Sequence, residues 1–264
     1  MVTLCLRMVA VIVSDRGYAL FLLGLPLVLA LLAHAVPGDS GLAPPASVPS
    51  AEAQRLLIVL TIGAVFLGVA VAIREIVGEA AIYRRERTVG LSPGAYLGSK
   101  IVIIGTINVF QVALFVSLAL AGRGHPADAL VIGSPTLEVI VAVTLVALAG
   151  TSLGLCLSAL ARTTEQTTPV LVIVVMAQLV LSGGLFELAG EAVMEQLAWL
   201  SPSRWGFAAA AATVDLQSMA AARDALWNHT AGSWLRSVLL LILQFVVFAG
   251  AARVAIRRLE PGRH

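Results

Sequence analysis

The sequence has little charge, little cysteine and no phosphate-binding loop. Asp, Glu, Lys and Arg make up only 12% of the 264 residues. The two cysteines, Cys5 and Cys156, lie in segments far apart in the chain, so no disulfide framework is indicated. Because no Gly-x-x-x-x-Gly-Lys-Ser/Thr segment occurs, we expect that the chain neither binds nor hydrolyses ATP by itself.

Catalytic, metal and nucleic-acid sites are not indicated either. The four histidines are scattered, with no carboxylate or cysteine at the spacing of a metal or acid–base site. Basic residues do not interleave with aromatic residues as they do in nucleic-acid-binding proteins. We therefore predict no catalytic residue, no metal or cofactor bound by this chain, and no nucleic-acid partner.

Apolar residues, by contrast, dominate the sequence. They make up 59% of it, and the mean hydropathy is +0.97. Several runs approach the roughly 20 residues that cross a bilayer as a helix. We predict an all-α integral membrane protein, surrounded by membrane lipids, with a single domain over residues 1–264. Six transmembrane helices are expected, at residues 18–36, 56–73, 96–120, 137–160, 170–186 and 237–255.

Two further segments are apolar but unsuited to crossing a membrane. Residues 1–16 have a narrow polar stripe and too few apolar residues to span, which predicts an interfacial helix. Residues 187–234 are too polar to span and too apolar for a free loop, so we expect outer helices that are re-entrant or lie along the membrane. All four tryptophans lie in this segment, and we expect them at the membrane interface. Three carboxylates there are predicted to share one helical face turned to water: Glu187, Glu191 and Glu195.

The distribution of basic residues predicts the orientation of the chain. If both termini are cytoplasmic, 12 of the 17 basic residues lie on the inner side, as the positive-inside rule predicts. The outer segments then carry only Arg55, Arg123, Arg204, Arg223 and Arg236. This orientation places residues 74–94, between the second and third spans, in the cytoplasm.

Residues 74–94 are the one long charged passage of the chain. Their charges fall mostly on one side of a helix, which predicts a short amphipathic helix along a surface, ended by Gly90 and Pro93. The apolar strip of this helix is expected to consist of Ile76, Ala80, Ile82 and Val89. A basic loop that contacts anionic lipid is the alternative interpretation, and the interleaved glutamates make it the weaker one.

Motifs in this passage and before the last span resemble a known family. Residues 85–100, RERTVGLSPGAYLGSK, resemble the signature that follows the second transmembrane helix in type-2 ABC exporter permeases of the G subfamily. Residues 201–206, SPSRWG, and 213–216, TVDL, are similar to the outer segment of actinobacterial members, in which the permease is often fused behind forkhead-associated and ATPase domains. The resemblance covers essentially the whole chain.

The resemblance implies the permease subunit of an ATP-driven exporter in a bacterial cell membrane. Such a subunit moves a lipid, glycolipid or drug out of the cytoplasm or the inner leaflet, and it works as a permease dimer. It has a connecting helix at the amino terminus and a coupling helix, here residues 74–94, that docks on a nucleotide-binding domain. That domain would bind ATP and Mg²⁺. We expect it on a separate ATPase subunit, which a start at Met1 fits, or elsewhere in a longer gene product.

The residues expected to couple the permease to the ATPase come from this passage and from the polar turn after the fourth span. They are Glu75, Glu79, Tyr83, Arg84, Arg85, Glu86, Arg87, Gly90, Lys100, Arg162 and Glu165. No charged residue lies deep in a span and no internal repeat occurs, which argues against a secondary transporter. A non-transporting membrane anchor or regulatory subunit with the permease fold stays open as the alternative function.

Polar and aromatic residues inside the spans are candidates for a substrate pathway. Asn108 and Gln111 share a helical face with Phe115, and hydrogen bonding between helices is the stronger interpretation of both amides, as it is of Gln178 and Gln244. By resemblance, an apolar plug near the outer leaflet closes the exit at the end of the fifth span. The pathway candidates are Phe66, Asn108, Gln111, Phe115, Gln178, Leu181, Leu185 and Phe186.

Small residues recur at every fourth position on two spans. Because small side chains let helix backbones approach closely, both stripes predict tight helix packing. The stripes are Ala64, Gly68 and Ala72 on the second span, and Gly150, Gly154 and Ser158 on the fourth. At the outer end of the fourth span, Glu138 is expected in the headgroup region.

Overall fold

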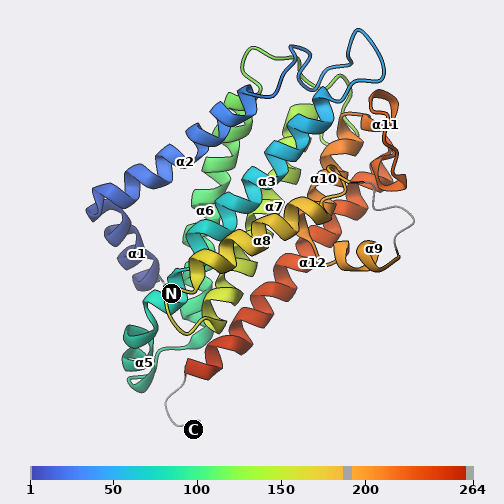
Figure 1. The fold of residues 1–264 in the computed structure, drawn as a ribbon. Coiled ribbons are helices and arrows are strands. Elements are labelled where there is room, and N and C mark those ends of the chain that lie inside the picture. Colours follow the sequence, from blue (N-terminus) through green and yellow to red (C-terminus); the bar gives the residue numbers. More distant parts are fainter. Residues whose placement is uncertain (1, 187–191, 260–264) are drawn as a thin grey trace.

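The computed structural model describes residues 2–186 and 192–259, which form helices without any strand among them (Figure 1). Five helical stretches in this part of the chain are long and apolar enough to cross a membrane, by length and composition. They are α2 (Arg16–His34), α3 (Glu52–Ala72) with α4 (Glu75–Gly78), α6 (Pro93–Ala119), α7 (Pro135–Leu160), and α12 (Ala231–Ile256) with the 3-10 turn η2 (Arg257–Leu259). The predicted all-α, multi-pass membrane fold is confirmed.

The predicted fifth span, residues 170–186, corresponds to the shorter helix α8. This helix covers Thr167–Leu181, which is 15 residues, or about 22 Å at a rise of 1.5 Å per residue. The hydrocarbon core of a bilayer is about 30 Å thick. Six crossings therefore stay a prediction at α8, whereas the other five predicted spans coincide with long apolar helices.

The remaining elements are short. They are α1 (Val2–Ser14), α5 (Ala80–Thr88), α9 (Ala192–Ala198), α10 (Pro202–Thr213), α11 (Leu216–Met219) and the 3-10 turn η1 (Ala225–Trp227). Helix α1 coincides with the helix predicted at residues 1–16. A proline at the first position opens α6, α7 and α10, where its missing N–H costs no intrahelical hydrogen bond.

The bundle has two distinct ends. Figure 1 shows α5 and the last turns of α12 at one end, which we call the α5 end, and α11 with the loop between α2 and α3 at the opposite end, the α11 end. The arginines of α5 and of η2 therefore lie at the same end of the molecule.

Helices α3 and α7 pack against each other through the two small-residue stripes. A Cβ atom on Gly68 would lie 2.1 Å from the backbone oxygen of Ala147, and one on Gly154 would lie 2.9 Å from the Cβ of Ala72. These distances leave no room for a side chain at either glycine. The prediction of close packing from the stripes is confirmed.

Helix α10 lies inside the bundle, against α3, α7 and α12 (Figure 1). All twelve of its residues are buried. Helix α10 therefore packs among the long helices and not along the outside of the bundle, and its re-entrant path in the membrane stays a prediction. Glu195 of α9 is exposed, as expected, whereas Glu187 and Glu191 lie outside the described residues.

The predicted interfacial position of the tryptophans is wrong for three of them. Trp205, Trp227 and Trp234 are at most 4% exposed, and only Trp199 is half exposed. The reason is that α10 carries Trp205 into the bundle, and Trp227 packs edge-on against Phe207 of the same helix. These large rings fill the space between α10 and its neighbours, where they bury far more surface than at a headgroup layer.

Candidate functional site

The passage between α3 and α6, residues 73–92, forms the α4–α5 corner at the α5 end of the bundle. Its first helix is capped by a neighbouring span. The hydroxyl of Ser158 on α7 accepts hydrogen bonds from the backbone N–H groups of Ile76 (3.0 Å) and Val77 (3.1 Å). These groups belong to the first turn of α4 and have no acceptor within the helix. The stripe pattern predicted only packing for Ser158, and this capping role could not be read from it.

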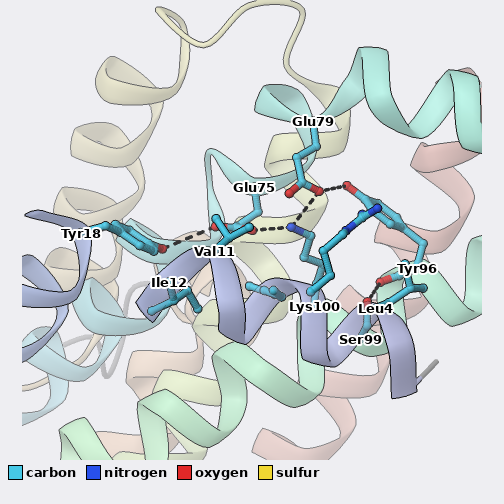
Figure 2. Close-up of a pocket in the computed structure, with 11 residues that line it drawn as sticks. Leu4, Val11, Ile12, Tyr18, Glu75, Glu79, Tyr96, Ser99 and Lys100 are labelled. Atoms are coloured by element: carbon cyan, nitrogen blue, oxygen red, sulfur yellow. Dashed lines mark hydrogen bonds and ion pairs between the residues drawn. The ribbon is translucent and has the colours of Figure 1, made fainter. Parts of the chain in front are cut away.

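Lys100 on α6 holds the buried side of the α4–α5 corner through two ion pairs (Figure 2). Its ammonium Nζ lies 2.7 Å from Oε2 of Glu75 and 2.8 Å from Oε2 of Glu79. Lys100 is the only lysine in the sequence and is 4% exposed. The structure thus brings three of the predicted coupling residues together within the subunit, and the burial of Lys100 keeps it from contact with a partner chain.

Two tyrosine hydroxyls complete this cluster, which we call the Lys100 cluster. The hydroxyl of Tyr18 on α2 donates to Oε1 of Glu75 at 3.5 Å, and that of Tyr96 on α6 donates to Oε2 of Glu79 at 3.1 Å (Figure 2). The cluster therefore joins α2, α6, α4 and the α4–α5 junction at Glu79. Neither Tyr18 nor Tyr96 was predicted as a site residue, because each becomes a partner only once the helices pack.

Helix α1 covers the cluster from outside. Leu4, Val11 and Ile12 of α1 line a small cavity of about 70 Å³ above Lys100 (Figure 2). Arg7 of the same helix forms an ion pair with Glu86 of α5, and this pairing raises the pKa of the Arg7 guanidinium. The amino-terminal helix is in this way tied directly to α5.

The predicted apolar strip of residues 74–94 holds at Ile76, which is buried, and is wrong at Ile82 and Val89, which are 52% and 85% exposed. Tyr83 is buried in their place, and its ring lies 4.8 Å from that of Tyr96 at a tilt of 44°. The reason is a break at Glu79, which separates α4 from α5. A single helical wheel drawn across this break rotates the second half to the wrong face, since each residue turns an α-helix by about 100°.

The outer face of α5 presents two arginines. Arg84 and Arg85 are exposed, while Glu86 and Arg87 are partly buried. The guanidinium of Arg87 donates to the backbone oxygen of Leu91 at 3.1 Å. Gly90 ends the corner with a φ of +102°, a conformation that favours glycine, as predicted for a helix terminator.

The polar turn between α7 and α8 lies at the same end. Arg162 and Glu165 are exposed there, and a hydrogen bond from the Thr163 hydroxyl lowers the pKa of the Glu165 carboxyl. The link from this turn to the corner is Arg74, whose guanidinium donates to the hydroxyls of Thr167 (3.3 Å) and Thr168 (2.7 Å) in the first turn of α8. The turn and the corner are thus connected through an arginine that sequence analysis did not select.

Two of the pathway candidates lie in the interior of the subunit. Asn108 on α6 donates to the hydroxyl of Thr151 on α7, and it is fully buried. Phe115 is also fully buried, against Gly63 on α3. These contacts match the interpretation of polar residues in spans as links between helices.

Gln111 has a specific structural task that the sequence did not reveal. Pro26 stands inside α2 and has no N–H to donate to the carbonyl of Leu22, one turn earlier. The side-chain Nε2 of Gln111 donates to this carbonyl at 2.6 Å. An amide on α6 therefore replaces the hydrogen bond that the proline removes from α2.

Gln178 and Gln244 also serve as links. Oε1 of Gln178, on α8, accepts from the hydroxyl of Ser201 (2.7 Å) and the backbone N–H of Ser203 (3.0 Å), which ties α8 to the start of α10. Nε2 of Gln244, on α12, donates to the backbone oxygen of Trp199 at 2.8 Å. The short helices of the outer segment are held by spans on both sides.

Phe66 lies in a groove that runs along α3 between α2 and α8. The groove has a lower cavity of about 460 Å³ toward the α5 end and an upper cavity of about 590 Å³, and Phe66 lines both. The upper cavity has only apolar side chains and Gly63 in its walls, while the lower one also contains Arg74 and Glu75. Beyond the groove, Leu181 is partly buried, and Leu185 and Phe186 are about half exposed.

A buried ion pair also holds the first turn of α10. Arg204 is 4% exposed, and its Nη2 lies 2.6 Å from Oδ2 of Asp224, just before η1. A Cβ atom on Gly183, at the end of α8, would lie 1.8 Å from Nη1 of Arg204, and this glycine has a φ of +76°. The sequence shows Arg204 as an outer basic residue within the SPSRWG motif but not its buried partner, and the Gly183–Gly184 pair is the signal that could have indicated a close approach.

Glu138 lies in the first turn of α7, at the end of the predicted span, but it is enclosed by protein instead of facing headgroups. Its side chain is fully buried and accepts hydrogen bonds from the backbone N–H groups of residues 130–132 and from the hydroxyl of Thr213 on α10. The carboxylate is buried because the loop between α6 and α7 folds over it and supplies the donors that water would otherwise provide.

No group of three or more His, Cys, Asp or Glu side chains arranged to hold a metal ion occurs among the residues that the structure describes. The charged groups of the corner are engaged with one another or exposed at the surface. The arrangement suits a mechanical contact between helices, and its outward face, with Arg84 and Arg85, suits an acidic protein surface.

Comparisons with known proteins agree with this geometry. The model of the ABC-2 type transporter family matches residues 1–214. A protein of Mycobacterium tuberculosis named ABC transporter ATP-binding/permease protein Rv1747 is 42% identical over 262 residues, which is 97% of this chain. The chain spans 30% of the length of that relative. The α4–α5 corner thus lies within a multi-pass membrane component of an ABC transporter, and the chain belongs to the ABC-2 type transporter family.

Proposed function

We propose that this chain is the permease of an ATP-driven exporter, energised by a nucleotide-binding domain that is not part of the described sequence. The relative's name combines ATP-binding and permease functions, and this chain matches less than a third of its length. A separate ATPase subunit or a fused ATPase domain both fit this match. ATP and Mg²⁺ are bound and used on that domain, and the permease supplies no catalytic group.

The construction of the α4–α5 corner carries this proposal. On its inner side the corner is bound to α2, α6 and α7 through Tyr18, Lys100 and Ser158. On its outer side, Arg84 and Arg85 are exposed. A domain that pushes on this outer face therefore displaces three spans together, because the corner cannot move without them.

The direction of the chain in the membrane follows from the same end of the bundle. Positively charged residues are retained on the cytoplasmic side, and the α5 end carries the arginines of α5 and η2. We place this end, with both termini, in the cytoplasm of a bacterial cell, and the α11 end outside. With α8 as a crossing, the chain has six spans.

The groove along α3 supports an amphipathic or hydrophobic substrate. Its two cavities are within the range of about 300–1,000 Å³ that is typical of ligand sites, and they are lined mainly by apolar side chains. Phe66 is the pathway candidate that lies in it. The apolar residues of α8 that remain exposed, Val172, Ile173 and Met176, provide a face for lipid or for a second permease copy in a dimer.

Cross-linking at the outer face of α5 tests the proposal. A cysteine at Ile82, which is 52% exposed, should form a cross-link with the candidate ATPase through a short bifunctional reagent. A cysteine at Tyr83, one residue away and 1% exposed, is the matched control and should not react. A permease that cross-links to no ATPase encoded in the same cell, and that stimulates no ATP hydrolysis, would instead be a non-transporting anchor or regulatory subunit with this fold.

A further inference from the structure

The lower end of the groove along α3 differs from the rest of it in having an arginine that forms no ion pair with the described residues. Arg74 lines the lower cavity and is exposed. Its guanidinium bonds to the hydroxyls of Thr167 and Thr168, which are neutral acceptors. No carboxylate lies within ion-pair distance of it among residues 2–186 and 192–259.

The carboxylate next to Arg74 in the chain is engaged elsewhere. Oε2 of Glu75 is 2.7 Å from the Lys100 ammonium, which also pairs with Glu79, and Oε1 of Glu75 accepts from the Tyr18 hydroxyl. Glu75 is therefore held in the Lys100 cluster and forms no ion pair with Arg74. Both residues line the lower cavity, and the Arg74 guanidinium stays available there for an anionic partner.

A second positive field reaches the same place. Thr167 and Thr168 are the first two residues of α8, and the preceding residue Gln166 makes no side-chain cap for the helix. Thr167 donates its backbone N–H to the oxygen of Thr164 and Pro169 has none, so the N–H of Thr168 and the partial positive charge of the helix terminus remain. A guanidinium, two hydroxyls and a helix terminus at one mouth form a recognition site for a phosphate group.

The cavity above Arg74 is suited to hydrocarbon chains. The lower cavity is bounded by Phe21, Phe66 and Leu171, and it shares Phe66 with the upper cavity, whose walls have no polar side chain. Phe21 and Val28 of α2, on the rim, are about half exposed and open the groove to the hydrocarbon of the bilayer. Charge at one end and apolar walls over the remaining length match the two parts of a phospholipid.

We propose that the groove between α2, α3 and α8 takes an anionic phospholipid from the bilayer, with its phosphate at Arg74 and its acyl chains beside Phe66. This assignment rests on the proposed export function and specifies its substrate class. A zwitterionic lipid also has a phosphate, but its ammonium group cancels the net charge that Arg74 attracts. The site therefore favours a lipid with a net negative headgroup.

Photo-cross-linking from inside the groove tests this selectivity without ATP. The variant Phe66→p-benzoylphenylalanine is purified and placed in vesicles of phosphatidylcholine that contain equal, traceable amounts of either phosphatidylglycerol or further phosphatidylcholine with the same acyl chains. We expect about fivefold more cross-linked phosphatidylglycerol, the ratio that one arginine near a membrane surface provides. Arg74→Gln in the same background should reduce the ratio to nearly one, and Arg74→Lys should keep most of it.

Arg85→Gln is the matched control, because it removes one exposed arginine at the same end of the bundle but outside the groove. It should leave the ratio unchanged. Equal labelling of both lipids by the parent variant would overturn the proposal even if Arg74→Gln failed to fold. A loss of selectivity in Arg85→Gln as large as that in Arg74→Gln would contradict the site, because it would assign the selectivity to general surface charge. A covalent permease dimer in place of lipid adducts would also contradict it, because the groove would then hold a second copy of the chain.

This experiment separates the lipid site from the export function. Selective labelling together with no ATP-dependent lipid movement, after reconstitution with the ATPase, would contradict the exporter and leave the lipid site in place. ATP-driven export of phosphatidylcholine and phosphatidylglycerol at equal rates, with equal labelling, would contradict the headgroup selectivity alone.

Discussion

Both ends of the bundle are held by buried charges, but the charges have different surroundings. At the α11 end, Arg204 and Asp224 form a pair with side chains that are 4% and 11% exposed. At the α5 end, Lys100 is 5% exposed at its side chain, while its partners Glu75 and Glu79 are 17% and 35% exposed. The Arg204–Asp224 pair is enclosed, whereas the Lys100 cluster is partly in contact with solvent.

This difference indicates what each end does. The Arg204–Asp224 pair fixes α10 against η1 and the end of α8, and it presents no exposed surface to a partner. The Lys100 cluster fixes the α4–α5 corner on one side and leaves the face with Arg84 and Arg85 exposed on the other. A rigid attachment with one exposed face suits the end that receives force from another domain, and a fully enclosed attachment suits the end that only has to keep its shape.

The largest effect is expected when the enclosed Arg204–Asp224 pair is broken. Asp224→Leu leaves the Arg204 guanidinium buried without its carboxylate, which should lower the free energy of unfolding by about 3–5 kcal/mol. Denaturant unfolding of the purified chain in detergent micelles measures this loss. The double variant Arg204→Met/Asp224→Leu removes both charges and should recover most of it. Equal stability of the single and double variants would contradict a special role for the pair.

A smaller loss is expected from the partly hydrated Lys100 cluster. Lys100→Met leaves Glu75 and Glu79 facing each other, but water can reach both carboxylates, so we expect a loss of about 1–3 kcal/mol in the free energy of unfolding. Coupling should suffer more than stability: reconstituted with its ATPase, this variant should hydrolyse ATP without a matching rate of transport.

The triple variant Lys100→Met/Glu75→Gln/Glu79→Gln is the control for the Lys100 cluster. It removes the repulsion between the carboxylates, so stability should return while the attachment to α6 stays weakened. Transport that recovers fully together with stability would contradict the role of Lys100 in transmitting motion.

The long spans could be predicted from the sequence because burial in lipid requires an uninterrupted apolar run, and such runs are visible directly. Helix α10 could only be placed in the outer segment. It is a 12-residue helix, and its burial inside the bundle depends on the grooves that α3, α7 and α12 leave between them. The positions of the buried tryptophans could not be predicted for the same reason, because these rings fill spaces that exist only once the helices have packed.

The candidate site could be located but not assembled from the sequence. The charged passage and Gly90 marked the corner correctly, and the family signature pointed to the same residues. Its internal contacts depend on partners far along the chain, such as Tyr18 and Ser158, and on the break at Glu79 that turns Tyr83 inward. No local pattern contains these distances, because each arises when two spans pack.

Between the two ends, the bond from Gln111 to α2 allows a test of moderate size. Gln111→Leu leaves the Leu22 carbonyl without a donor in an apolar region, so the free energy of unfolding should fall by about 1–3 kcal/mol. In the Pro26→Ala background, the alanine N–H can bond to this carbonyl, and the same Gln111→Leu change should cost much less. A cycle of the four variants in micelles measures the coupling, and equal costs in both backgrounds would show that Gln111 does not serve the proline.

The smallest effect on stability is expected at the exposed face of α5. Arg84→Gln and Arg85→Gln remove exposed charges that form no ion pair with the part of the chain that the structure describes, so the free energy of unfolding should change by no more than about 0.5 kcal/mol. The same two changes should strongly reduce the cross-link from a cysteine at Ile82 to the ATPase, because an acidic partner surface loses its counter-charges there. A cross-link of unchanged yield would place the docking contact elsewhere at this end, and a large loss of stability would mean that these arginines hold the corner instead of presenting it.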